Sequence, residues 1–301
     1  MANKGGGGCL VLLVIVAAIG GYAYYRSHQG GSAEPPAPPG STIGGGSGRY
    51  VALGDSYTSA PRTGKQAGGP AGCARSDNNY PHLVAAELKP AEFADVSCSG
   101  ATTANLTGSQ KTKDGTNPPQ LDAVNDKTTL VTIGIGGNDV GLIGLAGTCA
   151  TANPNGAPCR DRLTGGGKDE LAAKIDATAG KVSSTLKKIH QKAPKARVVV
   201  VGYPTVLPDG DGCWPVLPFG APDVAYLRDE LGKLNDMLAA QAKANNAGFA
   251  DTARPGKGHD LCTDSDERWV EGLIPTSAAA PLHPNAKGER GMADVVAKLL
   301  T

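Results

Sequence analysis

Short apolar runs rich in β-branched residues alternate along this chain with patterns typical of helices. The expected strands lie at residues 50–53, 92–97, 130–135 and 197–202, with a weaker one at 248–251. The expected helices lie at 80–88, 120–124, 168–192, 221–246 and 284–300. This order is typical of a parallel sheet covered by helices. We therefore predict a three-layer α/β/α sandwich with a mostly parallel sheet of about five strands.

The helix expected at 221–246 shows the clearest periodicity. Its leucines recur at three- and four-residue spacing, which predicts one stripe facing the core; they are Leu227, Leu231, Leu234 and Leu238. Two long segments, 146–167 and 205–222, fit neither a strand nor a helix. Long irregular segments in a compact domain are usually functional or cross-linked by disulfides, so we expect both to shape the mouth of a site.

The first 48 residues are predicted to be an export segment and a tether. Residues 9–25 carry no charge and are flanked by Lys4 and Arg26, which is typical of a signal-peptide core or a short membrane helix. Residues 27–48 are rich in Gly, Pro and Ser and cannot bury enough apolar surface to fold. We divide the chain into a signal peptide or signal anchor at 1–26, a linker at 27–48 and a folded domain at 49–301.

The fate of the leader decides where the folded domain resides. No small-x-small cleavage site follows the apolar run, which favours an uncleaved anchor and a membrane tether through residues 9–25. Cleavage would instead release a secreted protein. Either outcome predicts an extracytoplasmic domain.

Beyond the leader lies an even number of cysteines, which in an exported chain indicates disulfides. They are Cys73, Cys98, Cys149, Cys159, Cys213 and Cys262. Sequential pairing is the simplest arrangement, and each bridge would stabilise the domain by about 2–4 kcal/mol. Zinc is disfavoured because the sequence has no C-x-x-C pair and no nearby histidine cluster. We expect no metal and no cofactor.

The charge balance limits the possible partners. The net charge is +1 and the charges are scattered, which argues against nucleic acid because such binding needs clustered cations. Aromatic residues make up only 4% of the chain, which argues against an extended sugar-binding platform of stacked rings. We expect a monomer that acts on a small or lipidic molecule.

Polar residues follow the ends of the expected strands. The run 50–53 ends at Gly54-Asp55-Ser56, a turn that would lift the serine hydroxyl off the sheet edge. Gly100 and Asn138 follow the next two strands, and His283 stands just before the last helix. Each has an ordinary explanation as a turn or cap residue. Together they supply the nucleophile, the base and the donors that acyl transfer requires.

The segments GDSYTSA, SCSGAT, IGIGGND and PLHPNAKG resemble the four sequence blocks of the SGNH (GDSL-type) hydrolase superfamily. The cysteine-rich segments resemble its actinobacterial secreted esterase and lipase branch. The resemblance covers about residues 49–301 and implies a flavodoxin-like fold. It implies that Ser56 is the nucleophile and His283 the general base. It also implies an oxyanion hole made of the Ser56 and Gly100 backbone N–H groups and the Asn138 side-chain amide.

One position departs from the superfamily pattern. The aspartate usually found three residues before the histidine is Ala280 here. The third member of a triad must accept a hydrogen bond from Nδ1, and a backbone carbonyl can do so without charge. We therefore predict that the carbonyl oxygen of Ala280 orients His283. The alternative is a carboxylate from elsewhere, Asp264 or Asp266.

Other residues near the motifs have supporting roles in this interpretation. Asp55 and Asp139 are expected to bond nearby backbone and hold their turns. The apolar loop that contains Trp214, Val216 and Phe219 would either line an acyl chain or pack around Cys213.

The sequence thus predicts an extracytoplasmic serine esterase or lipase. It would hydrolyse carboxylic esters of small or lipid molecules through an acyl-enzyme on Ser56. A carbohydrate O-acetylesterase or a thioesterase is an alternative with the same chemistry. An envelope-tethered binding module with a degenerate site is the alternative without catalysis.

Overall fold

The computed structural model describes residues 48–145 and 147–301. The predicted leader at 1–26 and nearly all of the linker at 27–48 lie outside the described residues. Within the described ranges, no helix is both long enough and apolar enough to cross a membrane.

Five parallel strands form the central sheet in the order β2-β1-β5-β6-β7. They are β1 (Arg49–Gly54), β2 (Glu92–Asp95), β5 (Thr128–Gly134), β6 (Arg197–Val201) and β7 (Gly248–Ala250). All five predicted strands are confirmed, including the weak one at 248–251.

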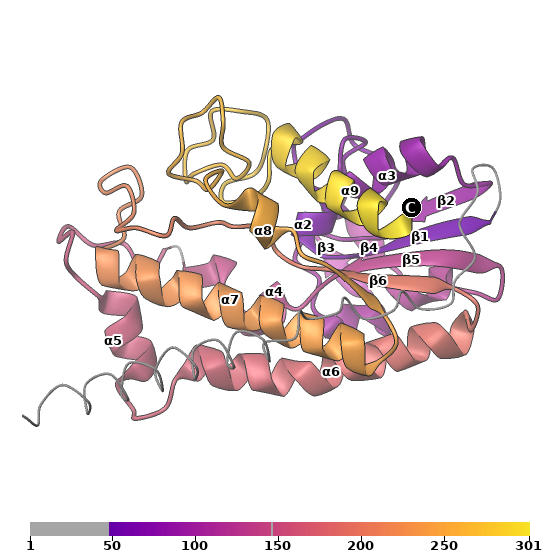
Figure 1. Ribbon diagram of the computed structural model, residues 1–301, viewed down its shortest axis with the longest axis horizontal. Helices are drawn as coiled ribbons and strands as arrows, with labels where there is room; N and C mark the ends of the chain where they lie inside the picture. The colour runs from indigo at the N-terminus through magenta and orange to yellow at the C-terminus, as the bar shows by residue number, and fades with distance from the viewer. Residues whose placement is uncertain (1–47, 146) are drawn as a thin grey trace, which may run out of the picture. The chain divides into compact units, whose positions relative to one another are not determined.

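Helices cover both faces of this sheet, as Figure 1 shows. One layer holds α3 (Tyr80–Leu88) and α9 (Ala286–Leu300), and the other holds α6 (Glu170–Lys192) and α7 (Ala221–Ala244). Successive side chains of a strand point to opposite faces of a sheet. Tyr50 and Ala52 accordingly pack in the core with α3 and α9, while Val51 and Leu53 pack in the core with α6 and α7. The predicted three-layer sandwich is confirmed.

Shorter elements occupy the connections. The helical ones are α2 (Ser56–Ser59), α4 (Gly137–Val140), α5 (Pro158–Thr164), α8 (Ala253–Gly256) and the 3₁₀ turns η1 (Ala71–Cys73), η2 (Thr103–Leu106), η3 (Gln120–Ala123) and η4 (Ile143–Leu145). A small antiparallel hairpin joins β3 (Gln110–Thr112) to β4 (Gly115–Asn117). The helix predicted at 120–124 is thus a single 3₁₀ turn, and the hairpin was not predicted.

The segment 146–167 contains a helix that the sequence did not indicate. Ala157 stands at the N-cap of α5 and has no polar side chain to cap it. The carboxylate of Asp223 caps the helix instead, accepting hydrogen bonds from the backbone N–H groups of Cys159 (3.0 Å) and Arg160 (2.8 Å). The cap is distant in sequence, so no local capping pattern marks this helix.

The cysteines pair sequentially, as expected. The disulfides are Cys73–Cys98, Cys149–Cys159 and Cys213–Cys262. The third one joins the irregular segment 205–222 to the long connection between α8 and α9. Both segments lie at the carboxyl ends of strands, where open parallel sheets bind their ligands.

Candidate active site

Ser56 is the first residue of α2, directly after β1. Asp55 caps this short helix, because its carboxylate accepts a 3.0 Å hydrogen bond from the backbone N–H of Tyr57. The side chain of Ser56 is brought against His283, which stands just before α9. The hydroxyl Oγ of Ser56 lies 2.7 Å from Nε2 of His283. The two residues that the sequence assigned as nucleophile and base are therefore in hydrogen-bond contact.

The acceptor for the other ring nitrogen differs from the prediction. Nδ1 of His283 lies 2.7 Å from the carbonyl oxygen of Pro281, not from that of Ala280. The Ala280 carbonyl instead accepts the backbone N–H of His283 at 3.2 Å. The predicted role of Ala280 is therefore corrected to Pro281. Within the described part of the chain, neither Asp264 nor Asp266 bonds to His283, and both side chains are exposed.

The residue between the acceptor and the base, Leu282, has a φ of +61°. This left-handed conformation is rare for a bulky residue. The expectation for Ala280 assumed that the acceptor would occupy the position of the superfamily's aspartate.

The loop that carries His283 is fixed at several backbone groups. The backbone N–H of Glu271 donates to the His283 carbonyl (3.0 Å), and the N–H of Ala280 donates to the Pro61 carbonyl (2.9 Å). The buried carboxylate of Glu271 also accepts a 2.8 Å hydrogen bond from the side chain of Asn285. The acceptor carbonyl therefore has a defined position although it carries no charge.

Burial lowers the pKa of His283 below its ordinary value, and the hydrogen bond to the Pro281 carbonyl opposes that effect. A carbonyl can only accept, so Nδ1 carries the hydrogen and Nε2 is free to accept the serine proton. This is the tautomer that a general base facing Ser56 requires.

The structure places Asn138 beside the turn that contains Gly100. Gly100 has a φ of +78° and is exposed, and the nearest atom to a Cβ at this position would be 3.8 Å away. The side-chain amide of Asn138 donates a 2.9 Å hydrogen bond to the carbonyl of Ala101, the next residue. In the described residues, the backbone N–H groups of Ser56 and Gly100 donate to no protein acceptor.

Asp139 ties the two donor-bearing turns together. Its carboxylate accepts hydrogen bonds from the backbone N–H (2.8 Å) and the hydroxyl (2.6 Å) of Thr103, and Lys181 lies 3.3 Å away. Asp139 was expected to bond the backbone of its own turn. Its carboxylate instead bonds Thr103, which follows the Gly100 turn. This fixes Asn138 relative to Gly100.

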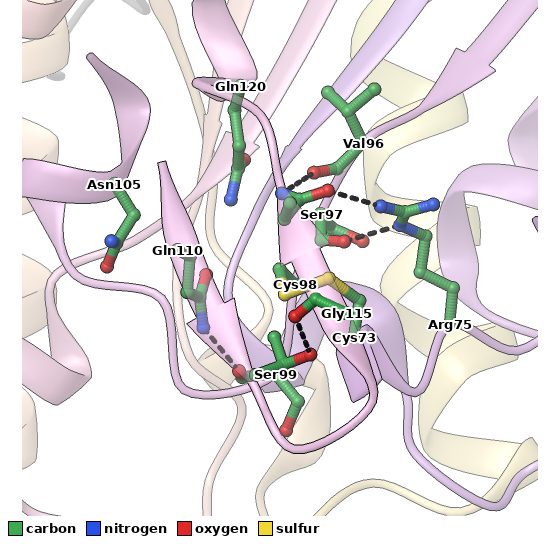
Figure 2. Close-up of a disulfide and its surroundings, with 12 residues drawn as sticks. Cys73, Arg75, Val96, Ser97, Cys98, Ser99, Asn105, Gln110, Gly115 and Gln120 are labelled. Carbon is green, nitrogen blue, oxygen red and sulfur yellow. Dashed lines mark hydrogen bonds between the residues drawn. A yellow bond between two sulfur atoms is a disulfide. The ribbon is translucent and has the colours of Figure 1, made fainter. Parts of the chain in front are cut away.

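A disulfide anchors the segment that leads into the Gly100 turn. Figure 2 shows Cys73–Cys98 with the Arg75 guanidinium and the Gln110 amide around the segment that leads to Gly100. Arg75 donates to the Ser97 carbonyl, and Gln110 donates to the Ser99 carbonyl at 2.8 Å. These bonds hold the backbone on both sides of Cys98.

Tyr203, which no sequence motif indicated, links the nucleophile turn to the Asn138 turn. Its hydroxyl donates to Asp55 at 2.6 Å and accepts the backbone N–H of Gly137 at 2.7 Å. Burial raises the pKa of Asp55 to about 7, although the hydrogen bonds from Tyr203 and Tyr57 oppose that shift. The position of Tyr203 just after β6 was the one signal in the sequence that pointed to the site.

An apolar cavity begins beside these residues. It is lined by the immediate neighbours of three candidate residues, namely Tyr57, Gly137 and Leu282, and it opens to solvent. Three of the four periodic leucines of α7 line it, namely Leu227, Leu231 and Leu234.

Only one residue of the apolar loop at 214–219 lines this cavity, so most of this loop does not form a wall for an acyl chain. Phe219 lines the cavity, whereas Leu217 is buried elsewhere in the core. Trp214 and Val216 are exposed, and the indole of Trp214 donates to the Thr151 carbonyl at 3.1 Å.

Comparisons with known proteins agree with this geometry. Residues 52–290 match the model of the GDSL-like Lipase/Acylhydrolase family. The chain is 39% identical to Lipase 2 of Streptomyces coelicolor over 254 residues, which are 81% of this chain and 83% of that protein. It is 31% identical to a lipase of Streptomyces rimosus, over 80% of this chain and 82% of that protein.

Two solved structures are similar over the same region. The phospholipase A1 from Streptomyces albidoflavus NA297 has a TM-score of 0.71 at 30% identity, and the match covers 83% of this chain and 98% of that one. The extracellular lipase from Streptomyces rimosus has a TM-score of 0.68 at 29% identity, covering 83% and 99% respectively.

Proposed function

Because this chain belongs to the GDSL-like lipase/acylhydrolase family and is a serine hydrolase of carboxylic esters, we propose that Ser56 and His283 perform the reaction. The observation that carries this assignment is the 2.7 Å contact between the serine Oγ and the imidazole Nε2. Because Nδ1 donates to the Pro281 carbonyl, Nε2 is the nitrogen that accepts the serine proton.

In the proposed mechanism, His283 takes the proton of Ser56 as Oγ attacks the ester carbonyl carbon. The oxygen of that carbonyl becomes negative and receives hydrogen bonds from the Ser56 and Gly100 backbone N–H groups and the Asn138 amide. His283 then protonates the leaving alcohol. Water repeats the cycle on the acyl-enzyme and releases the acid.

The acyl group would lie in the apolar cavity. This cavity is lined by Tyr57 and Leu282, the neighbours of the nucleophile and the base. Burial of apolar surface contributes about 0.8 kcal/mol per methylene, so the cavity favours acyl chains longer than acetyl. This supports a lipase or a carboxylesterase over a carbohydrate O-acetylesterase.

We further propose that the protein is exported and tethered by residues 9–25, and that it acts as a monomer. Three disulfides persist in oxidising compartments, and one similar structure is described as an extracellular lipase. Fractionation of cells that produce the full chain tests the tether, because an anchored enzyme sediments with membranes and a secreted one remains in the medium.

Hydrolysis of chromogenic esters by the purified protein and by Ser56→Ala tests the catalytic assignment. Wild-type activity should exceed that of the variant by about 10³-fold or more. Equal rates for the two proteins on every ester would exclude Ser56 as the nucleophile and would favour the binding-module alternative.

A further inference from the structure

A second cavity adjoins the apolar one. It lies at the carboxyl ends of β6 and β7 and opens to solvent. Three side chains line both cavities: Val206, Leu207 and Leu231. They therefore form the wall between the two spaces.

Hydrogen bonds fix the backbone of the segment that carries Val206 and Leu207. The backbone N–H of Leu261 donates to the Val206 carbonyl at 3.1 Å, and Arg228 donates to the Pro208 carbonyl at 3.1 Å. The hydroxyl of Thr205 donates to the Ala253 carbonyl at 2.7 Å. Leu231 projects from the middle of α7. Because both supports are fixed, a smaller side chain in the wall leaves an opening that the backbone does not close.

The two cavities differ in polarity. The first is lined almost entirely by apolar side chains. The second is lined by Asp209, Arg228, Lys257 and Asn235, and Lys257 lies 3.8 Å from the Asp209 carboxylate. The purely apolar lining therefore ends at the wall, and the space beyond it is lined by charged and polar side chains together with the apolar side chains of the wall.

We propose that Val206, Leu207 and Leu231 set the longest acyl chain that the enzyme accepts, by closing the acyl cavity before this polar space. This inference rests on the proposed function, since it assigns the cavity beside Ser56 to the acyl group. Each methylene added to the substrate should raise kcat/KM about fourfold until the chain meets the wall. Longer chains should then give no further gain.

The experiment measures kcat/KM for monomeric p-nitrophenyl esters from acetyl to palmitoyl. Wild type should show a break in the profile at one chain length. Leu231→Ala opens the wall, so the break should move to a chain longer by two or more methylenes. The ratio of kcat/KM for the longest ester to that for the shortest should then rise at least about tenfold.

Leu227→Ala is the matched control. Leu227 lies one helical turn away on α7 and lines the first cavity but not the second, so its truncation widens the cavity without opening the wall. The break should stay at the wild-type length. Coincident profiles for the two variants, or an unmoved break in Leu231→Ala, would overturn the proposal.

Val206→Ala covers the case in which Leu231→Ala does not fold, because it opens the same wall from the loop side. The proposed function fails by a different result, namely that wild type does not exceed Ser56→Ala on any ester. The two failures are therefore distinguishable in one series of assays.

Discussion

The hydroxyl of Tyr57 donates a 2.6 Å hydrogen bond to the carbonyl of Leu282. Tyr57 directly follows Ser56 and Leu282 directly precedes His283, so this bond joins the turn of the nucleophile to the loop of the base. The phenol ring also lies against the imidazole, with ring centroids 5.0 Å apart. A left-handed conformation costs a residue with a side chain about 1–2 kcal/mol, and the bond from Tyr57 holds Leu282 in it.

Replacing Tyr57 with Phe should lower kcat about tenfold with little change in KM. The variant leaves the Leu282 carbonyl unpaired and lets the acceptor at Pro281 move, while the ring still lines the acyl cavity. Steady-state kinetics on a short-chain ester give the two parameters separately.

Tyr50→Phe is the matched control for that change. It also removes a buried hydroxyl, which bonds to Thr132 at 2.8 Å on the face of the sheet toward α3 and α9. Both variants should lose roughly 1–3 kcal/mol of unfolding free energy. If Tyr50→Phe lowers kcat as much as Tyr57→Phe does, the role of Tyr57 is only structural.

The acid limb of the pH profile should report His283. Burial lowers the pKa of the imidazole, and its Nδ1 partner is an uncharged carbonyl. The base must be neutral to accept the serine proton, so kcat/KM should fall only below a pH of about 6.5, the usual histidine pKa. A limb centred above neutral pH would mean that a carboxylate stabilises the imidazolium.

Asn138→Ala should lower kcat by about 10²–10³-fold, the usual effect of removing one oxyanion-hole donor. KM should change little, because the charge that this amide stabilises develops in the transition state. Asn79→Ala serves as the control for a lost asparagine, since Asn79 caps α3 and bonds Asp95 away from the site. An unchanged kcat in a folded Asn138→Ala protein would remove this residue from the proposed oxyanion hole.

Asp55→Asn should become more stable relative to wild type as the pH rises. The pKa of Asp55 is raised from 3.8 to about 7 by burial, so the folded state binds this proton more tightly than the unfolded state. The stability that the protonated carboxyl contributes is complete at pH values below 3.8 and is lost as the pH rises through about 7.

Urea unfolding of both proteins at a series of pH values measures this effect. The difference in unfolding free energy should change by about 1.4 kcal/mol per pH unit in that interval. Asp176→Asn, on the exposed side of α6, provides the matched change of charge. A pH-independent difference between Asp55→Asn and wild type would show that the carboxyl titrates alike in both states.

The sheet and its large helices were predictable because their signals are local. The helix α3 begins and ends where the pattern placed it, at Tyr80 and Leu88, with Asn79 as its N-cap. The strands appear as apolar runs because both faces of the sheet are covered. The helix α5 was not predictable, since its cap is the carboxylate of Asp223 from another part of the chain.

The candidate site likewise has one part that local sequence motifs predict and another part that depends on contacts between distant segments. Ser56, Gly100, Asn138 and His283 each belong to a short local motif, and the structure brings Ser56 against His283 and Asn138 beside the Gly100 turn. The contacts of Tyr57 and Tyr203 join segments far apart in sequence, so no motif contains them. The acceptor at Pro281 occurs beside a left-handed residue, Leu282, and no pattern in the sequence Ala280-Pro281-Leu282 indicates that conformation.

The carbonyl that orients His283 belongs to the main chain, and this changes how the site responds to mutation. A catalytic aspartate can be deleted by a single substitution, whereas every amino acid at position 281 brings a carbonyl oxygen. The vulnerability therefore moves from the acceptor to the residues whose side chains hold the loop, Tyr57 through the Leu282 carbonyl and Glu271 through Asn285 and Thr276. Variants that disable this base will thus be found at positions that never touch the imidazole nitrogens.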